Sequence, residues 1–411
     1  MTQRPAAPAA PPPLWGARGP ELRWALRALC LTEIVSWGVL YYAFPVLLPS
    51  ITADTGWSTT TLTAIFSAAL VISGLAGIAV GRIIDRHGPR WVMTAGSVTA
   101  VAAIAVIGTA HSLWQYIAGW ALAGLAMSGV LYAPAFAAVT VWFGRDRVRA
   151  LTAITLVAGL ASTVFAPLTA LLDEHSSWRT SYLALGAVLA IATVIPHAAA
   201  LRPPWPPAHA RAEISPPANY EGTAPSALDA QVDRGAFVRL TAAYTAIGLC
   251  STAVVVNLVP LLHSRGYTAT SAAWALGIGG VGQVLGRLGY ARLAQRVGLL
   301  ARSVAVFAVV AVTAALFALV SGPFVVLLMI ALLAGNARGL ATLLSATAIS
   351  DRWGVARYAR LNGLFTAPTM IAGALAPFIG AGLAAILGGY PIAFFALALL
   401  GGAAALVLAS S

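Results

Sequence analysis

The sequence predicts an all-α membrane protein with about twelve transmembrane helices, arranged as two pseudo-symmetric six-helix bundles. Three observations support this fold class. First, 60% of the 411 residues are hydrophobic and only 9% are charged, a balance that cannot give a soluble domain its polar surface. Second, long uncharged runs recur between short clusters of arginine. Third, the first half of the chain is repeated in the second.

The apolar runs define the helices, because roughly 20 apolar residues are needed to cross the hydrocarbon core. The expected spans of the first half are 25–50, 59–81, 92–111, 114–143, 150–172 and 178–201. Those of the second half are 237–262, 270–291, 300–320, 323–350, 358–383 and 386–410. The first run follows a Pro-rich amino terminus, the second and third flank an arginine-rich gap, and so do the fourth and fifth. The second half repeats this spacing.

The remaining segments give the domain organisation. Residues 1–24 lack an apolar stretch before their arginines, so we expect them to form a disordered cytoplasmic amino terminus rather than a signal peptide. Residues 25–201 form the first bundle and 236–411 the second. Between them, residues 202–235 are rich in proline and poor in large apolar side chains, which is typical of a flexible cytoplasmic linker.

The basic residues indicate the orientation. All 24 are arginine, and with both termini inside, 20 of them fall on the cytoplasmic side. Only Arg179 and Arg265 lie outside, and two more lie within helices. We therefore expect a multi-pass protein of the cell (inner) membrane. Because the arginines are scattered through short loops rather than gathered in one patch, the net charge of +12 favours contact with the lipid bilayer and not with nucleic acid.

The internal repeat has a constant shift of 210 residues, as from Gly56 to Gly266. Transporter folds are commonly built from duplicated halves. The matched residues are Gly56, Trp57, Ser58 with Gly266, Tyr267, Thr268; Arg82, Arg86, Gly88 with Arg292, Arg296, Gly298; Gly144, Arg147, Leu151 with Gly354, Arg357, Leu361; and Ala166, Pro167 with Ala376, Pro377. The two halves are therefore expected to be duplicated, parallel six-helix units.

The loop after the second expected helix, GRIIDRHGPR, resembles the best-known motif of the major facilitator superfamily. Within it, the chain looks most like the monocarboxylate transporter and oxalate/formate antiporter branch, through Phe44-Pro45, Gly56-Trp57-Ser58, the segments VWFGRDRVRALT and DRWGVARYARLNGL, and Gly389-Tyr390. The fourth-helix arginine frequent in the superfamily is missing near Trp120. The Gly-Pro pattern of antiporters is incomplete around Gly159, Ala166 and Pro167. Both departures disfavour a typical proton-driven drug exporter.

The resemblance implies a gate at the cytoplasmic face. Its residues are Gly81, Arg82, Asp85, Arg86, Gly88 and Arg90. The matching Asp in the superfamily favours one state through arginines and the positive end of a helix from the other half, here the helix that opens near Tyr358. The arginines of the motif serve either in this gate or as topology anchors. Gln295 replaces the Asp in the second copy, so the gate is expected to be asymmetric.

Two arginines lie within apolar runs, where a charge costs on the order of 2.5–3.5 kcal/mol or more. Arg338 lies about 18 Å from the end of its helix, at 1.5 Å per residue. It is held by helix carbonyls or a polar neighbour such as Asn336, or it lines a cavity. Arg287 lies near the membrane edge and could extend to the headgroups. The resemblance implies instead that Arg287 binds a substrate carboxylate, with Gln283, four residues earlier on the same helix face, at the position of the family's Asp.

Glu33 is the one acid placed within a helix. It either pairs with an arginine of the bundle or takes up a proton when desolvated; because Gln283 cannot titrate, proton coupling would depend on Glu33, and obligatory anion exchange is the other possibility. Two arginines against one glutamate leave a positive charge that an anionic substrate could neutralise. The resemblance further places Trp37, Tyr41, Tyr132 and Asn257 on cavity-lining helices, as substrate contacts or as packing residues.

The leading hypothesis is a secondary transporter that moves a small organic anion, a mono- or dicarboxylate, by alternating access. It is expected to act as a monomer, with a co-transported proton or an exchanged anion. The alternative is an exporter of a neutral or cationic compound, and the remote alternative is a membrane-embedded sensor. The sequence has no His-Glu-x-x-His pair and no nucleotide-binding loop, and Cys30 and Cys250 lie within apolar runs, so no enzyme activity, cofactor or metal is expected.

Overall fold

The computed structural model describes residues 19–205, 234–349, 352 and 358–409. Every regular element in these residues is helical, so the predicted all-α fold is confirmed. The elements of the first half are α1 (Gly19–Trp37), η1 (Gly38–Tyr42), α2 (Ala43–Thr55), α3 (Thr59–His87), α4 (Pro89–Gly108), α5 (Leu113–Val130), α6 (Tyr132–Phe143), η2 (Gly144–Asp146), α7 (Arg147–Gly159), α8 (Ala161–His175), α9 (Trp178–Leu189), η3 (Ala190–Val194) and α10 (Ile195–Ala200). Those of the second half are α12 (Arg234–Ser264), α13 (Ala269–Arg296), α14 (Leu299–Leu319), α15 (Phe324–Thr347), α17 (Tyr358–Leu387) and α18 (Tyr390–Ala409).

The start of the chain corrects one prediction. Helix α1 begins at Gly19, so residues 19–24, predicted to be disordered, are helical. Pro20 stands in the first turn, where its missing N–H would have had no helical partner. Residues 1–18 and 206–233, which include most of the predicted amino-terminal segment and linker, lie outside the described residues.

The helix caps repeat at the predicted shift of 210 residues. The side chain of Ser58 caps α3 by accepting a hydrogen bond from the Thr61 N–H at 3.0 Å. At the equivalent place, Thr268 caps α13 by accepting from the Ser271 N–H at 3.1 Å. Both caps follow a left-handed glycine, Gly56 at φ 71° and Gly266 at φ 86°, a conformation that side chains with a Cβ rarely adopt. The duplication therefore extends to the backbone of the turns.

The described residues contain 11 helices long and apolar enough to cross a membrane. The remaining predicted span, 270–291, lies inside α13, which is a continuous helix of 28 residues. Its glycines, Gln283 and Arg287 lower its hydropathy below that of the other spans. In contrast, the predicted spans 25–50, 114–143, 150–172 and 178–201 are each interrupted, by π-helical segments or by extended or irregular residues.

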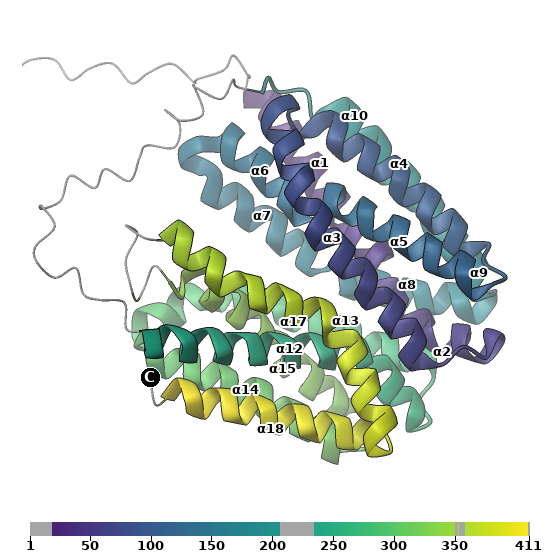
Figure 1. The fold of residues 1–411 in the computed structure, drawn as a ribbon, viewed down its shortest axis with the longest axis vertical. Coiled ribbons are helices and arrows are strands. Elements are labelled where there is room, and N and C mark those ends of the chain that lie inside the picture. Colours follow the sequence, from purple (N-terminus) through teal and green to yellow (C-terminus); the bar gives the residue numbers. More distant parts are fainter. Residues whose placement is uncertain (1–18, 206–233, 350–351, 353–357, 410–411) are drawn as a thin grey trace, which may run out of the picture.

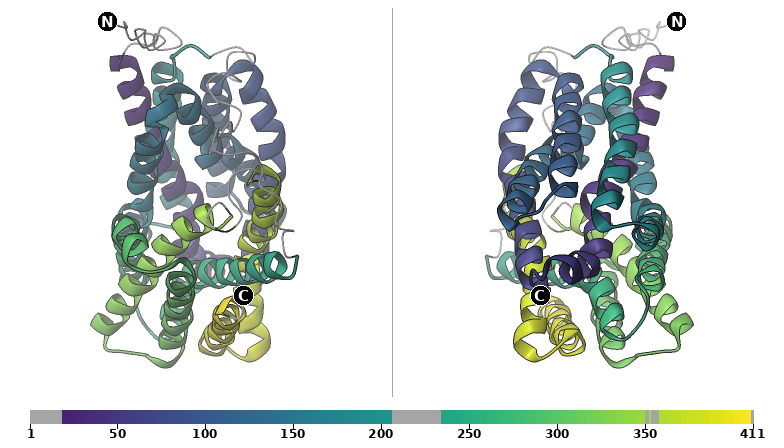
Figure 2. Two further views of the ribbon diagram at one scale, coloured as in Figure 1. Left: turned by 90° about the vertical axis from the view of Figure 1, so that its left-hand side faces the viewer. Right: turned by 90° about the vertical axis from the view of Figure 1, so that its right-hand side faces the viewer.

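The helices form two bundles (Figure 1), each packed mainly within itself. In the second half α13 packs along α15 and α14 along α18, while α4 packs on α5 and α3 on α5 in the first. Across the halves, α8 packs on α13 and α3 on α17. We call the end where α10 stops and α12 starts the linker end. The two bundles converge at the opposite end and diverge toward the linker end, with the first half above the second in both views of Figure 2.

The core of the first half explains one departure from the superfamily pattern. Trp120 is fully buried on α5. Its ring packs edge-on against Phe44, with centroids 5.4 Å apart, and against Phe66 at 5.0 Å. The position where the superfamily often has an arginine is therefore an aromatic packing site in this chain.

Candidate functional site

The candidate site lies in the middle of the molecule, between the bundles. Glu33, Gln283 and Arg338 each lie 14 residues from the start of their helix, or about 21 Å at 1.5 Å per residue. Three first-half helices are interrupted at this level: α1 passes into the π-helical η1, α5 ends at the extended Leu131, and α7 ends at Leu160. Interrupted helices at mid-membrane are a common feature of transporter binding sites.

Arg287 connects the two halves. From α13, its Nη1 donates a hydrogen bond to the backbone carbonyl of Thr155 on α7. The same side chain also interacts with Tyr132, the first residue of α6. Its Nε is buried and has no hydrogen-bond partner. Arg287 therefore does not extend to the membrane surface, as one reading of the sequence allowed, but turns inward toward the first half.

Arg338 is held by Gln283. Its Nη2 donates to the Gln283 Oε1 at 2.8 Å, from α15 to α13, and its Nε is buried without a hydrogen-bond partner. It also lies within electrostatic range of Tyr41 on η1. Gln283 stands one helical turn before Arg287, so the side chain that binds Arg338 lies on the same helix face as Arg287.

Glu33 is fully buried on α1. Its Oε2 accepts a hydrogen bond from the Trp37 Nε1 at 3.1 Å, and its Oε1 has no hydrogen-bond partner. Among the described residues, Asp54 and Arg179 form the one ion pair within 4.0 Å. Neither Glu33 nor the half-buried Arg287 and Arg338 is therefore part of such a pair in the part of the chain that the structure describes.

Aromatic rings cover the first-half side of the site. Trp37 lies between Tyr41, at a centroid distance of 5.3 Å, and Tyr132, at 5.0 Å. Tyr132 in turn is within electrostatic range of both Arg287 and Glu33. Trp37, Tyr41 and Tyr132 are each only partly buried. The structure thus brings together three of the four polar or aromatic residues that the resemblance placed on cavity-lining helices.

The fourth residue, Asn257, lies elsewhere. It is fully buried on α12 and donates from Nδ2 to the carbonyls of Ala253 at 2.9 Å and Pro377 at 3.4 Å. A Cβ at Gly380 would approach its Nδ2 to 2.2 Å, so Asn257 occupies the tight contact between α12 and α17. Asn336 also has a packing position, because its backbone lies against Gly286 of α13.

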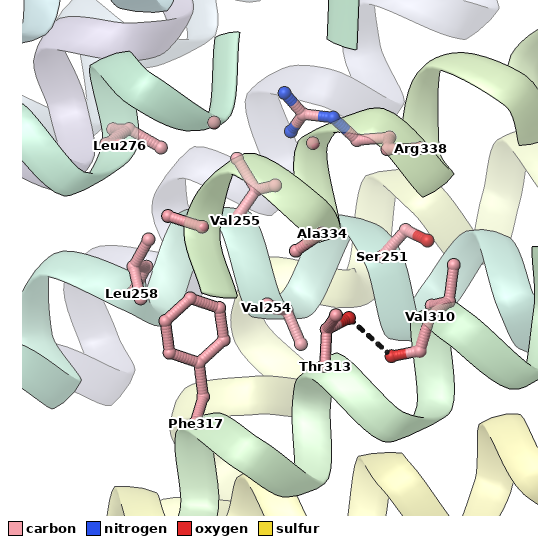
Figure 3. Close-up of a pocket in the computed structure, with 13 residues that line it drawn as sticks. Ser251, Val254, Val255, Leu258, Leu276, Val310, Thr313, Phe317, Ala334 and Arg338 are labelled. Carbon is pink, nitrogen blue, oxygen red and sulfur yellow. Dashed lines mark hydrogen bonds between the residues drawn. The ribbon is translucent and has the colours of Figure 1, made fainter. Parts of the chain in front are cut away.

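A small cavity of about 40 Å³ lies inside the second half beside Arg338. Figure 3 shows the guanidinium at one end of it and Phe317 at the other. Most of the lining is apolar; Ser251 and Thr313 add hydroxyl groups, and that of Thr313 is already bonded to the Val310 carbonyl at 3.0 Å. An engineered apolar cavity that binds benzene measures roughly 150 Å³, so this much smaller cavity has room for only a few water molecules or a very small group.

The predicted gate residues lie at the linker end. Gly81, Arg82, Asp85 and Arg86 belong to the last turns of α3, Gly88 ends that helix at φ 79°, and Arg90 is in the first turn of α4. The carbonyl of Asp85 accepts a hydrogen bond from the Trp205 Nε1 at 3.3 Å, and the Arg90 Nε donates to the Ala198 carbonyl at 2.9 Å. Residues 353–357, just before α17, lie outside the described residues.

At the opposite end, polar side chains join the bundles. Glu174 of α8 accepts a hydrogen bond from the Thr270 hydroxyl of α13 at 2.9 Å. Closer to the middle of the molecule, near the start of α8, the Thr163 hydroxyl donates to the Gly277 carbonyl at 2.8 Å. Arg265 secures the turn before α13 by donating to the carbonyls of Val320 and Ala318, both at 2.7 Å. Partial burial lowers the pKa of Arg265 from its ordinary value, but a guanidinium keeps its charge at all physiological pH values.

Two features of the site were absent from the sequence-based predictions. They are the hydrogen bond from Arg287 to the Thr155 carbonyl and the close approach of Gly159 to Arg287. Both depend on which helices pack against each other. A backbone carbonyl carries no residue identity, so no motif could have indicated it. Gly159 was noted only as part of an incomplete antiporter pattern.

The sequence matches one family model and is similar to parts of two known proteins. A family model described as Major Facilitator Superfamily matches residues 29–228 and 240–410. An "MFS-type transporter" of Gibberella moniliformis is 32% identical over 108 residues, which is 26% of each chain. "Monocarboxylate transporter 13" of Bos taurus is 25% identical over 266 residues, or 64% of this chain. The chain thus spans 26% and 57% of the length of these two relatives.

Solved structures share the fold at low identity. One is a bacterial homologue of the human lysosomal transporter Spinster in an inward-facing and occupied conformation, with a TM-score of 0.72, 16% identity, and coverage of 95% of this chain and 97% of that one. Another is a mutant of the nucleoside transporter NupG, with a TM-score of 0.73, 16% identity, and coverage of 95% and 98%. At this identity the likeness concerns the fold alone.

Proposed function

We propose that this chain, which belongs to the major facilitator superfamily, is a secondary transporter that moves a small organic anion, a mono- or dicarboxylate, by alternating access. One observation carries the proposal. Arg287 and Arg338 lie between the bundles, Arg338 bonded to Gln283 and Arg287 to the Thr155 carbonyl, and neither has a carboxylate within ion-pair distance among the described residues. A charge within a membrane-spanning helix that lacks a counter-ion is costly.

A carboxylate would supply the missing counter-ion. Guanidinium groups bind carboxylates through two parallel charge-assisted hydrogen bonds, and each of these arginines has a buried Nε–H with no acceptor. Trp37, Tyr41 and Tyr132 would flank the bound anion from the first half, while the second half would hold its charge. The similarity to a monocarboxylate transporter agrees with this substrate class.

We further propose that the linker end faces the cytoplasm of a cell whose inner membrane holds the protein. The arginine distribution supports this orientation, since 20 of the 24 arginines then lie inside. The bundles diverge toward that end (Figure 1), so the state described here would be inward-facing. A cysteine introduced at Arg234, in a chain whose Cys30 and Cys250 are replaced by Ala, tests the orientation when it is labelled with an impermeant thiol reagent. Labelling of inside-out vesicles alone is expected, and labelling of intact cells would contradict it.

The central experiment is uptake by proteoliposomes of labelled acetate, lactate, oxalate and succinate, with and without a pH gradient. We expect uptake of at least one of these anions by the wild type and loss of most of it in Arg287→Gln and Arg338→Gln. Arg265→Gln is the matched control, because Arg265 also binds backbone carbonyls but lies at the opposite end of the bundle.

Two results would contradict the proposal: no carboxylate is taken up, or Arg287→Gln transports as well as the wild type. Transport of a neutral or cationic compound by the same vesicles would instead support the alternative of an exporter, in which Glu33 would be the charged group of the site.

A further inference from the structure

In this structure, Arg287 donates to a backbone carbonyl of the other half. Its Nη1 donates to the Thr155 carbonyl of α7, and Tyr132 of α6 interacts with the same guanidinium. Both partners belong to the first bundle, whereas Arg287 belongs to α13 of the second. The contact therefore exists only in states in which α7 and α13 approach this closely.

Gly159 makes this contact possible. In an α-helix the carbonyl of residue i points toward the N–H of residue i+4, and each Cβ is tilted back toward the amino terminus. Gly159 is four residues after Thr155, so a side chain there would cover the Thr155 carbonyl. A Cβ at position 159 would lie 3.0 Å from the Arg287 Nη1 and 3.1 Å from the Val284 Cγ2. Helix α7 ends immediately afterwards, at Leu160.

The carbonyl is a partial partner for the guanidinium. It is neutral and accepts from Nη1, while the Arg287 Nε remains buried without an acceptor. A carboxylate forms shorter and stronger hydrogen bonds and can accept from two guanidinium nitrogens at once. The Thr155 carbonyl can thus order the side chain in the absence of an anion and still be displaced by one.

We infer that Gly159 and the Thr155 carbonyl form the resting position of Arg287, from which an anion has to draw the side chain before the halves separate at this level. Gly159 is then a positioning residue that sets the apparent affinity for the anion. This inference rests on the proposed function, in which Arg287 binds the transported anion.

The test adds a methyl group at the resting position. A Cβ in Gly159→Ala would lie 3.0 Å from the Arg287 Nη1 and push the guanidinium away from the carbonyl by a few tenths of an ångström. The hydrogen bond to the first half is then weaker, and the anion displaces it more easily. We expect the KM of the anion taken up fastest from the panel of acetate, lactate, oxalate and succinate to fall roughly threefold or more, without a matching change in kcat. Gly373→Ala is the control, because a Cβ at Gly373 meets nothing within 4 Å; its KM is expected to equal that of the wild type.

A double variant distinguishes the effect of the Arg287 contact from the effect of packing against Val284. Gly159→Ala with Val284→Ala removes the contact with Val284 and leaves the one with Arg287. A KM that stays low in this variant supports the resting position. A KM that returns to the wild-type value, or that is unchanged or raised in Gly159→Ala alone, overturns it. If Arg287→Gln abolishes uptake while Gly159→Ala changes nothing, this inference fails and the proposed function stands.

A second measurement requires no transport. Spin labels at the exposed positions Thr152 on α7 and Leu288 on α13 report the separation of the two helices in the absence of anion. We expect Gly159→Ala, with or without Val284→Ala, to lengthen this distance. In a chain that also carries Arg287→Gln and Val284→Ala, we expect Gly159→Ala to leave the distance unchanged. Equal distances in all variants would overturn the inference even if no anion of the panel were transported.

Discussion

Gln283 accepts a hydrogen bond from Arg338 and stands one helical turn before Arg287. A neutral side chain at this position leaves both guanidinium groups available to an anion, whereas a carboxylate would neutralise one of them. The identity of this single residue therefore sets the net charge of the candidate site.

Replacing Gln283 by Asp is expected to weaken anion uptake at neutral pH by roughly tenfold, which corresponds to about 1.4 kcal/mol. An ionised Asp would occupy Arg338. The guanidinium favours the charged form of that Asp, so it stays ionised from about pH 8 to about pH 5 and the KM of the variant should remain raised throughout this range. Gln283→Asn is the neutral control. A Gln283→Asp KM equal to that of the wild type or of Gln283→Asn would contradict this account of the site charge.

Glu33 allows a separate test of coupling. It is buried with one hydrogen bond, from Trp37, and Tyr132 lies within electrostatic range of both Glu33 and Arg287. If Glu33 carries a proton, Glu33→Gln should abolish the stimulation of uptake by an inward pH gradient while anion exchange across symmetrical pH continues. The assay compares gradient-driven uptake with exchange in the same vesicles. Undiminished stimulation in the variant would exclude Glu33 as the proton carrier.

For the individual residues, the sequence predicted which charged side chains lie inside the bundle but not which groups they bind. The spacing of four places Gln283 and Arg287 on one helix face, and both arginines were identified as inward-facing candidates. However, Gln283 bonds to Arg338, and Arg287 bonds to a carbonyl on another helix. These pairings depend on how α13 sits against α15 and α7, which spacing within one helix does not determine.

Among the elements, α13 and α15 form the tightest described pair in the second half. A Cβ at Gly335 would come within 1.9 Å of the Gly279 carbonyl oxygen, and one at Gly339 within 2.2 Å of that of Gln283. Glycine at these positions lets the two backbones touch, as small residues commonly do between membrane helices. This contact holds Gln283 and Arg338 at hydrogen-bonding distance.

Gly335→Ala is therefore expected to destabilise the second bundle by about 1–3 kcal/mol, because the backbone it strikes cannot rotate away. Thermal unfolding in detergent, followed by tryptophan fluorescence, measures the loss as a lower Tm. Gly382→Ala is the control, since a Cβ there meets nothing within 4 Å. Equal Tm values for the two variants would show that α13 and α15 can separate without cost.

The spans and their order were predictable because apolar length is a strong signal. The interruptions were not. Leu131 is extended and Leu160 ends α7, yet both are ordinary apolar residues within apolar runs. In lipid, a break is tolerated only where surrounding protein or a polar cavity satisfies the freed backbone groups, so its position depends on tertiary structure rather than on local sequence.

For the whole molecule, the polar contacts at the opposite end keep the bundles together there while they diverge at the linker end. Glu174 and Thr270 form one such contact, between α8 and α13. Alternating access requires the bundles to separate at this end in the other half of the cycle. A covalent bridge at the same place should therefore stop transport.

Glu174→Cys with Thr270→Cys, in a chain whose Cys30 and Cys250 are replaced by Ala, provides this test. Bridging the pair with a short bis-methanethiosulfonate reagent is expected to abolish uptake, and a reductant should restore it. Each single-cysteine variant treated in the same way is the control. Full transport by completely bridged protein would show that this end does not open during the cycle.

Helix α13 has a further consequence for how the protein is made. Unlike the other long helices of the described residues, it falls short of the apolarity of a membrane span, because it carries the glycines that contact α15 together with Gln283 and Arg287. An arginine at the centre of a helix adds about 2.5–3.5 kcal/mol to its insertion from the translocon, and Arg287, nearer the membrane edge, adds a smaller cost. The ribosome has to add about 50 residues before α15 is complete, since α13 ends at Arg296 and α15 at Thr347. During that interval α13 lacks the partner that covers its polar face, so insertion of the candidate site is a cooperative event between two helices that are not adjacent in the chain.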